Sequence, residues 1–336
     1  MSAEALPVVA ADAALKPAPA SALVETRDLT RRYGNSLALN SLTLTIPQGA
    51  IFGFIGPNGA GKTTTMRILT TLLLPTSGQA WVAGHSVVRE PQAVRRMVGF
   101  MPDFFGVYDN LKAWEYLDFF AAAYGVPASR RTTLIDELLD LVDLSHKRDA
   151  YVMDLSRGMK QRLSLARTMA HNPELLILDE PASGLDPRAR VELRELLREL
   201  QALGKTIMIS SHILTELAEM CTHIGIIEQG TLLAAGDVQT MMHSLQPHRI
   251  YEVHVLSDLH TAAELVRDLP GVLAVRELPD ESPPMLHIDH EGDEQQVGAL
   301  LTRLISGGAV VTHFAGQVSD LEEVFLRITA GTVASE

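Results

Sequence analysis

The sequence predicts an α/β protein with a largely parallel sheet, followed by a smaller α+β domain. Short apolar runs that are typical of buried strands stand at 50–55, 175–178 and 206–210. A Gly-rich loop follows the first run directly, and after Gly236 strand and helix patterns alternate in the order β-α-β-β-α-β-α. At 336 residues the chain is long enough for two hydrophobic cores.

The first predicted core begins with a strand over 50–55, bounded by glycines, and a helix over 62–74, which Pro75 stops. Strand, glycine loop and helix thus occur in the order that a phosphate-binding unit requires. Between the strands at 175–178 and 206–210, apolar residues recur at helical spacing. This pattern predicts a β-α-β unit, and therefore parallel strands.

A helical insertion is expected to interrupt this core at about 104–170. From about residue 112 onward amphipathic helix patterns dominate and strand patterns are absent. One apolar helix face consists of Leu134, Ile135, Leu138, Leu139 and Val142.

The region after Gly236 predicts a small ferredoxin-like sandwich. We expect strands over 250–256, 272–278, 285–290 and 310–314, and helices over 261–269, 295–305 and from Ser319. The chain then has three parts: an Ala/Pro-rich flexible tail at 1–22, a first domain at 23–240 and an acidic C-terminal domain at 245–336. The tail lacks a basic start before an apolar block, so it does not match a secretion signal.

Composition and charge exclude several classes of protein. The single cysteine, Cys221, excludes an intramolecular disulfide and a cysteine-based zinc site, and fits a reducing cytosol. The sequence has no run of about 20 apolar residues that could cross a bilayer. The net charge is −13, and residues 245–336 hold 15 Asp or Glu against 5 Arg and no Lys. Such a surface repels phosphate backbones, so we expect no nucleic-acid partner.

The Gly-rich loop satisfies the pattern G-x-x-x-x-G-K-[ST] between a predicted strand and a predicted helix. Backbone N–H groups of such a loop turn toward phosphates, and the helix N-terminus adds partial positive charge. Lys62 is placed to reach the β- and γ-phosphates, and Thr63 to hold Mg²⁺. The predicted nucleotide-binding residues are Gly56, Pro57, Asn58, Gly59, Ala60, Gly61, Lys62, Thr63 and Thr64. The alternative is a glycine turn that happens to precede Lys-Thr.

Two carboxylates, Asp179 and Glu180, follow the predicted strand 175–178. Open α/β sheets place their ligands at this carboxyl end of the strands. Asp179 would hold Mg²⁺, directly or through water, and Glu180 would take a proton from, or orient, the water that attacks the γ-phosphate. The alternative is an Asp-Glu pair that starts a surface turn before Pro181.

Together with four further segments, these motifs make the chain resemble the nucleotide-binding subunit of an ATP-binding cassette (ABC) transporter over roughly residues 23–240. Residues 155–162, Leu-Ser-Arg-Gly-Met-Lys-Gln-Arg, resemble the family signature L-S-G-G-Q, and residues 181–186 resemble the loop through which the two halves of an ABC dimer communicate. The resemblance implies a P-loop NTPase fold with a mixed sheet core, an antiparallel β subdomain and a helical subdomain. It also implies ATP contacts from Tyr33, Ser156, Gly158 and Asp186, and a γ-phosphate-sensing role for His212.

Two departures from the family pattern stand out. The signature has Arg157 in place of its first Gly and Met159 in place of its Gln. The positive charge of Arg157 favours a phosphate or a surface carboxylate as its neighbour. Asp103 stands where the family usually has a Gln that ligates Mg²⁺ and relays to the membrane subunit. A carboxylate also suits Mg²⁺, and the alternative is that Asp103 is a solvated turn residue.

The resemblance implies two protein partners. Because the signature of one subunit completes the ATP site of the other, the chain must pair with a second copy or a related ATPase chain. The second partner is a membrane-spanning permease, which places the chain in the cytoplasm on the inner face of the cell membrane. A short helix of that permease would dock beside the aromatic run 104–114, although these aromatics could equally be core residues.

The acidic C-terminal part resembles the tail of ATPase subunits in bacterial two-subunit exporters, and suits dimerisation or regulation. Metal sensing through the close pair His287 and His290 is the weaker alternative. For the whole chain we therefore expect an ATPase that powers an exporter. The competing hypotheses are a soluble ABC ATPase that acts on ribosomes or DNA, and a non-hydrolysing ATP-binding scaffold. Glu180 argues against the scaffold, which would not need a base beside Asp179.

Overall fold

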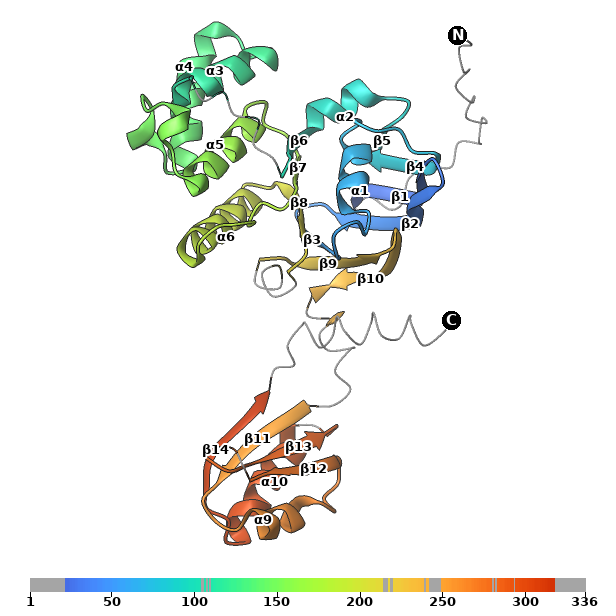
Figure 1. Ribbon diagram of the computed structural model, residues 1–336, viewed down its shortest axis with the longest axis vertical. Coiled ribbons are helices and arrows are strands. Elements are labelled where there is room, and N and C mark those ends of the chain that lie inside the picture. The colour runs from blue at the N-terminus through green and yellow to red at the C-terminus, as the bar shows by residue number, and fades with distance from the viewer. Residues whose placement is uncertain are drawn as a thin grey trace. The chain divides into compact units, whose positions relative to one another are not determined.

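The structure, a computed structural model, describes residues 22–103, 106, 108, 110–213, 217, 220–238, 240, 241, 249–279, 281, 283–292 and 294–317. The chain divides between Val238 and Gln239 into two compact units, each of which is described by itself (Figure 1). The tail expected at 1–22, apart from Ala22, and the helix expected from Ser319 lie outside the described residues.

A six-stranded sheet forms the centre of the first unit. Its order is β10-β9-β3-β8-β7-β6, and all neighbours are parallel except β9 and β10. The strands are β3 (Ile51–Ile55), β6 (Val98–Met101), β7 (Leu175–Leu178), β8 (Thr206–Ser211), β9 (His223–Glu228) and β10 (Thr231–Asp237). The helix α6 (Pro187–Ala202) connects β7 to the parallel β8, which confirms the predicted β-α-β unit.

An antiparallel sheet of order β2-β1-β4-β5 packs beside this centre. It consists of β1 (Ala22–Tyr33), β2 (Ser36–Pro47), β4 (Ser77–Val82) and β5 (His85–Ser86), and α2 spans Pro91–Met97. One hydrophobic cluster joins the two sheets through the helix α1 (Lys62–Leu69): Met66 and Ile68 are fully buried in it with Phe54 of β3 and Leu42 of β2.

The helix α1 ends five residues before the predicted end at Leu74. Thr71 adopts a left-handed conformation with φ of 62°. The N–H of Thr71 donates to the carbonyl of Ile68, and the N–H of Leu72 donates to the carbonyl of Arg67. This is a Schellman motif, which satisfies the last carbonyls of the helix and turns the chain away, so the leucines that follow do not extend the helix.

The helical insertion contains α3 (Ala113–Ala123), α4 (Ala128–Leu141) and α5 (Arg157–Met169), which pack on one another. Between residues 110 and 170, all of which are described, the only β pairing is an isolated bridge between Lys112 and Tyr151. This confirms the prediction that the segment contains helices and no strands. α5 also contacts β6, which attaches the insertion to the edge of the central sheet.

The second unit is a ferredoxin-like sandwich, as predicted. Its antiparallel sheet has the order β12-β13-β11-β14, and two helices cover one face (Figure 1). The elements are β11 (Arg249–Val255), α9 (Leu259–Val266), β12 (Val272–Leu278), β13 (Met285–His290), α10 (Glu294–Ser306) and β14 (Val311–Gln317). His290 is buried, whereas His287 is half-buried and pairs with Glu252 at 3.5 Å. Since the two histidines lie on opposite faces of β13, they do not form a joint ligand pair.

Candidate functional site

The Gly-rich loop joins the end of β3 to the start of α1. A Cβ on Gly56 would collide with the carbonyl oxygen of Ile227, and Gly61 caps α1 with φ of 109°, so both positions require glycine. The ammonium of Lys62 donates to the carbonyls of Gly56 at 2.5 Å and Pro57 at 3.2 Å. The loop therefore curls around a lysine whose side chain is buried, and burial lowers its pKa while the nearby carboxylates Glu180 and Asp179 oppose that shift.

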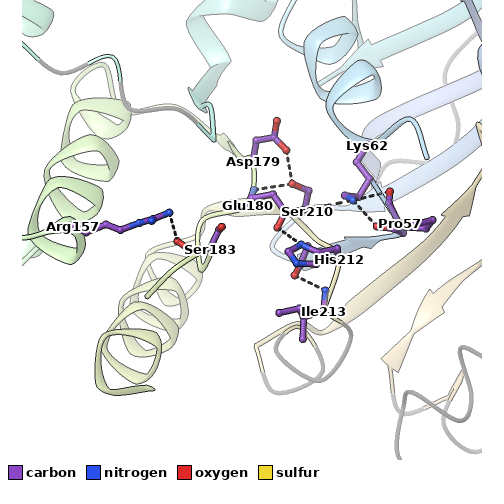
Figure 2. Close-up of polar contacts among 11 residues, drawn as sticks. Pro57, Lys62, Arg157, Asp179, Glu180, Ser183, Ser210, His212 and Ile213 are labelled. Atoms are coloured by element: carbon purple, nitrogen blue, oxygen red, sulfur yellow. Dashed lines mark hydrogen bonds and ion pairs between the residues drawn. The ribbon is translucent and has the colours of Figure 1, made fainter. Parts of the chain in front are cut away.

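The paired carboxylates lie at the carboxyl end of β7, as Figure 2 shows. Asp179 is 3% exposed, and its Oδ1 accepts a hydrogen bond from the Ser210 hydroxyl at 2.6 Å. The same hydroxyl oxygen accepts from the N–H of Glu180 at 2.9 Å. Glu180 has φ of 50°, a conformation that costs on the order of 1–3 kcal/mol and persists where neighbours fix it. Ser210 is one such neighbour, because it holds both carboxylate residues.

Glu180 lies between two of the other predicted residues. Its Oε1 is 3.6 Å from the Lys62 ammonium, and its Oε2 is 3.0 Å from Nδ1 of His212 (Figure 2). The Glu180 side chain is largely buried and the His212 side chain is 45% exposed. The site thus brings a buried cation, a carboxylate and an imidazole together beside the buried Asp179.

Ser210 is a site residue that the sequence motifs do not predict. It lies at the end of β8, two residues before His212, and is fully buried. A hydroxyl near the carboxyl end of a buried strand, directly beside the strand that precedes Asp179, was the available signal.

Other predicted residues lie around this centre. Thr63 and Thr64 are half-buried in the first turn of α1. Asp103 is exposed, two residues beyond Met101, whose carbonyl accepts the N–H of Asp179 at 2.9 Å. Within the described part of the chain, the Asp103 carboxylate makes no hydrogen bond or ion pair, so the structure does not bring it into the cluster.

Tyr33 ends β1 and is 45% exposed. The guanidinium carbon of Arg31 lies 4.7 Å from the centre of the Tyr33 ring. Arg31 also donates to the carbonyl of Leu74 at 3.0 Å. One face of the ring is therefore covered by the Arg31 cation.

The signature residues lie at the start of α5. The Ser156 hydroxyl caps the helix by accepting the N–H of Met159 at 3.3 Å, and Asp186 caps α6 by accepting the N–H of Ala189 at 2.9 Å. These two helix starts line a cavity of about 220 Å³ that Gly158 and Arg157 also border. Figure 2 shows Arg157 well apart from Lys62, so one chain does not bring its signature to its own phosphate loop.

A phosphate loop and two carboxylates at the carboxyl edge of a parallel sheet define the class of P-loop ATPases. Residues 39–183 match the family model described as ABC transporter. The bacitracin transport ATP-binding protein BcrA of Bacillus licheniformis is 36% identical over 93% of this chain and 98% of its own length. The daunorubicin/doxorubicin resistance ATP-binding protein DrrA of Streptomyces peucetius is 34% identical over 91% of this chain and 92% of its own. The chain belongs to the ABC transporter family.

Further comparisons identify the subunit. The Nod factor export ATP-binding protein I of Burkholderia orbicola is 34% identical over 91% of this chain and 96% of its own length. A solved ATP-binding subunit of an ABC transporter is 30% identical with a TM-score of 0.60, and the match covers 66% of this chain and 92% of that chain. The chain is an ATP-binding subunit of this family, an ATPase whose activity is coupled to transport by a membrane permease. In the described residues, no helix has the length and apolar character needed to cross a bilayer.

Proposed function

We propose that the chain powers an exporter by hydrolysing ATP between two paired cassettes on the cytoplasmic face of the membrane. The observation that carries the proposal is Glu180, which lies between Lys62 and His212 and next to the buried Asp179. The full-length relatives named for bacitracin transport, Nod factor export and drug resistance support export as the direction.

In this mechanism the N–H groups of the Gly-rich loop and the start of α1 bind the phosphates of ATP. Lys62 holds the β- and γ-phosphate oxygens, and its burial strengthens this charge interaction. Glu180 orients the attacking water and takes its proton as the γ-phosphate leaves ADP. His212 fixes the Glu180 carboxylate through the 3.0 Å contact and would sense the γ-phosphate.

The donor set suits Mg²⁺, which prefers hard oxygen ligands. The carboxylate of Asp179 offers Oδ2 while its Oδ1 accepts from Ser210, and Thr63 adds a hydroxyl in the first turn of α1. We assign these two residues to the metal, with Asp103 as a further candidate. When bound, Mg²⁺ neutralises charge on the β- and γ-phosphates.

The separation of the signature from Lys62 within one chain supports a paired arrangement (Figure 2). Ser156 and Gly158 of one chain would complete the ATP site of a second copy or a related chain.

We assign an aromatic surface of the first unit to a permease helix. It consists of Tyr108 and Phe119, whose side chains are about half exposed and whose ring centres lie 5.6 Å apart in an edge-on contact. We assign the second unit, which has its own core, to dimerisation or regulation.

The test is ATP hydrolysis by the purified chain and by the variant Glu180→Gln, with nucleotide binding measured on both. We expect the variant to bind ATP like the wild type and to lose at least a hundredfold in kcat, the order of a general-base contribution. Glu199→Gln, which removes an exposed carboxylate on α6, is the control and should keep full activity. Equal hydrolysis by the wild type and Glu180→Gln would contradict the assigned base.

Isolation of the tagged chain from gently solubilised membranes tests the transport role separately. A stoichiometric multi-span protein should copurify, and vesicles containing both chains should show ATP-dependent export. Recovery of ribosomes or nucleic acid instead would favour a soluble ABC ATPase.

A further inference from the structure

Arg157 takes the position of a signature glycine and is the first residue of α5. A positive charge at a helix N-terminus opposes the helix dipole, so the residue is unfavourable there unless something offsets it. The structure supplies a partner, because the Arg157 guanidinium donates to the carbonyl of Ser183 at 3.0 Å (Figure 2). Positions that break a local rule in this way are often functional.

The guanidinium packs closely against Ser183 and Gly184 of the loop 181–186, a contact that we call the seat of the guanidinium. A Cβ built on Gly184 would lie 2.5 Å from the guanidinium carbon, so a larger residue at this position would displace the end of the Arg157 side chain. Gly184 also has φ of +67°, a conformation that glycine adopts without strain. The neighbouring carbonyl groups of the loop therefore stay in place. Arg157 and the loop are therefore matched in shape as well as in hydrogen bonding.

The loop leads directly back to the site. It starts after Glu180, and the N–H of Ser183 donates to the carbonyl of Glu180 at 3.1 Å. Ser210 holds the Glu180 N–H from one side, while Arg157, through Ser183, holds the Glu180 carbonyl from the other. Hydrogen bonds thus hold both peptide groups of Glu180, the residue with the left-handed backbone.

We propose that Arg157 is a positioning residue that clamps the loop 181–186 to the start of α5 and so fixes the aim of the Glu180 carboxylate. The inference rests on the proposed hydrolytic role of Glu180. In the proposed pair, the clamp also couples two sites, because Ser156 next to Arg157 faces the partner's nucleotide while Glu180 acts on the chain's own.

The experiment measures kcat and KM for Arg157→Gln, together with hydrogen exchange of the loop in the nucleotide-free chain. We expect kcat to fall about fivefold with KM changed less than about twofold, the pattern of a lost transition-state contribution. Loop amides should exchange faster. Arg157→Lys should recover part of both effects, since an ammonium can donate one hydrogen bond to Ser183.

Arg188→Gln is the matched control. Arg188 borders the same cavity, but its side chain is 90% exposed and pairs with Glu192 rather than with the loop. This variant removes the same charge and should leave kcat and loop exchange unchanged.

A double-mutant comparison tests the seat. Gly184→Ala carries the same φ strain with or without the Arg157 side chain, but it collides with the guanidinium only when that side chain is present. Its effect on loop exchange should therefore be smaller in combination with Arg157→Gln, and strictly additive effects would contradict the seat.

Two results would overturn the clamp: loop exchange that Arg157→Gln leaves unchanged, or a change confined to KM, which would place the guanidinium on the nucleotide instead. Failure of the wild type to hydrolyse ATP would overturn the proposed function rather than the clamp, because loop exchange is measured without nucleotide.

Discussion

At the scale of single residues, Ser210 organises the site more than its small size suggests. One hydroxyl donates to Asp179 and accepts from the N–H of Glu180, and both contacts are at least partly buried. Removal of such a group leaves a buried carboxylate oxygen and a backbone N–H without their partner. The cost of that loss is typically about 1–3 kcal/mol.

We therefore expect Ser210→Ala to lower the free energy of unfolding by about 2 kcal/mol and kcat by about tenfold. Urea unfolding and steady-state ATP hydrolysis measure the two effects. The matched control is Ser211→Ala, because the neighbouring Ser211 hydroxyl accepts the N–H of Ile213 and does not contact either carboxylate. If both variants lost kcat equally, the special role of Ser210 would be wrong.

At the scale of elements, the sequence predicts elements that repeat a pattern and fails where a single local conformation decides. The helices of the insertion and the strands of the second unit follow from apolar periodicity, which their buried faces impose. The end of α1 does not, since Leu72, Leu73 and Leu74 continue the apolar run while the chain turns at Thr71. Threonine rarely adopts positive φ, so no residue signal marks that turn.

The parts of the candidate site also differ in how far the sequence predicts them. The carboxyl edge of a parallel sheet places Asp179, Glu180 and the loop near one another from sequence alone. The partners of Glu180, by contrast, depend on a left-handed backbone and on a hydroxyl from the adjacent strand, neither of which periodicity encodes. Asp103 shows the converse, since the family resemblance suggests a ligand while its carboxylate is exposed and makes no hydrogen bond or ion pair in the described residues, so its role at the metal stays a prediction.

The helix end gives a prediction at this scale. Thr71→Gly removes the cost of a left-handed β-branched residue, about 1 kcal/mol, and loses one exposed hydrogen bond from Arg95. We expect a net rise of about 0.5 kcal/mol in the free energy of unfolding. Thr70→Gly, one residue earlier at negative φ, should instead be destabilising. Thermal or urea unfolding distinguishes the two, and equal shifts would contradict the assigned motif.

At the scale of the whole molecule, each chain carries a single copy of every motif, and Figure 2 places its signature apart from its Lys62. A complete site then requires two chains, each giving its phosphate loop to one site and its Ser156 to the other. Such a pair has twofold symmetry if both chains are identical. Damage to the two motifs should consequently complement when it is carried by different chains.

The variants Lys62→Ala and Ser156→Ala test this directly. Each alone should hydrolyse ATP at a small fraction of the wild-type rate, because both sites of its homodimer are defective. In a mixed dimer, one site combines an intact Lys62 with an intact Ser156, while the other carries both defects. For random pairing and independent sites, an equimolar mixture should recover about a quarter of wild-type activity. Differently tagged chains that copurify as mixed dimers, yet recover no activity, would show that two copies do not build the site in this way.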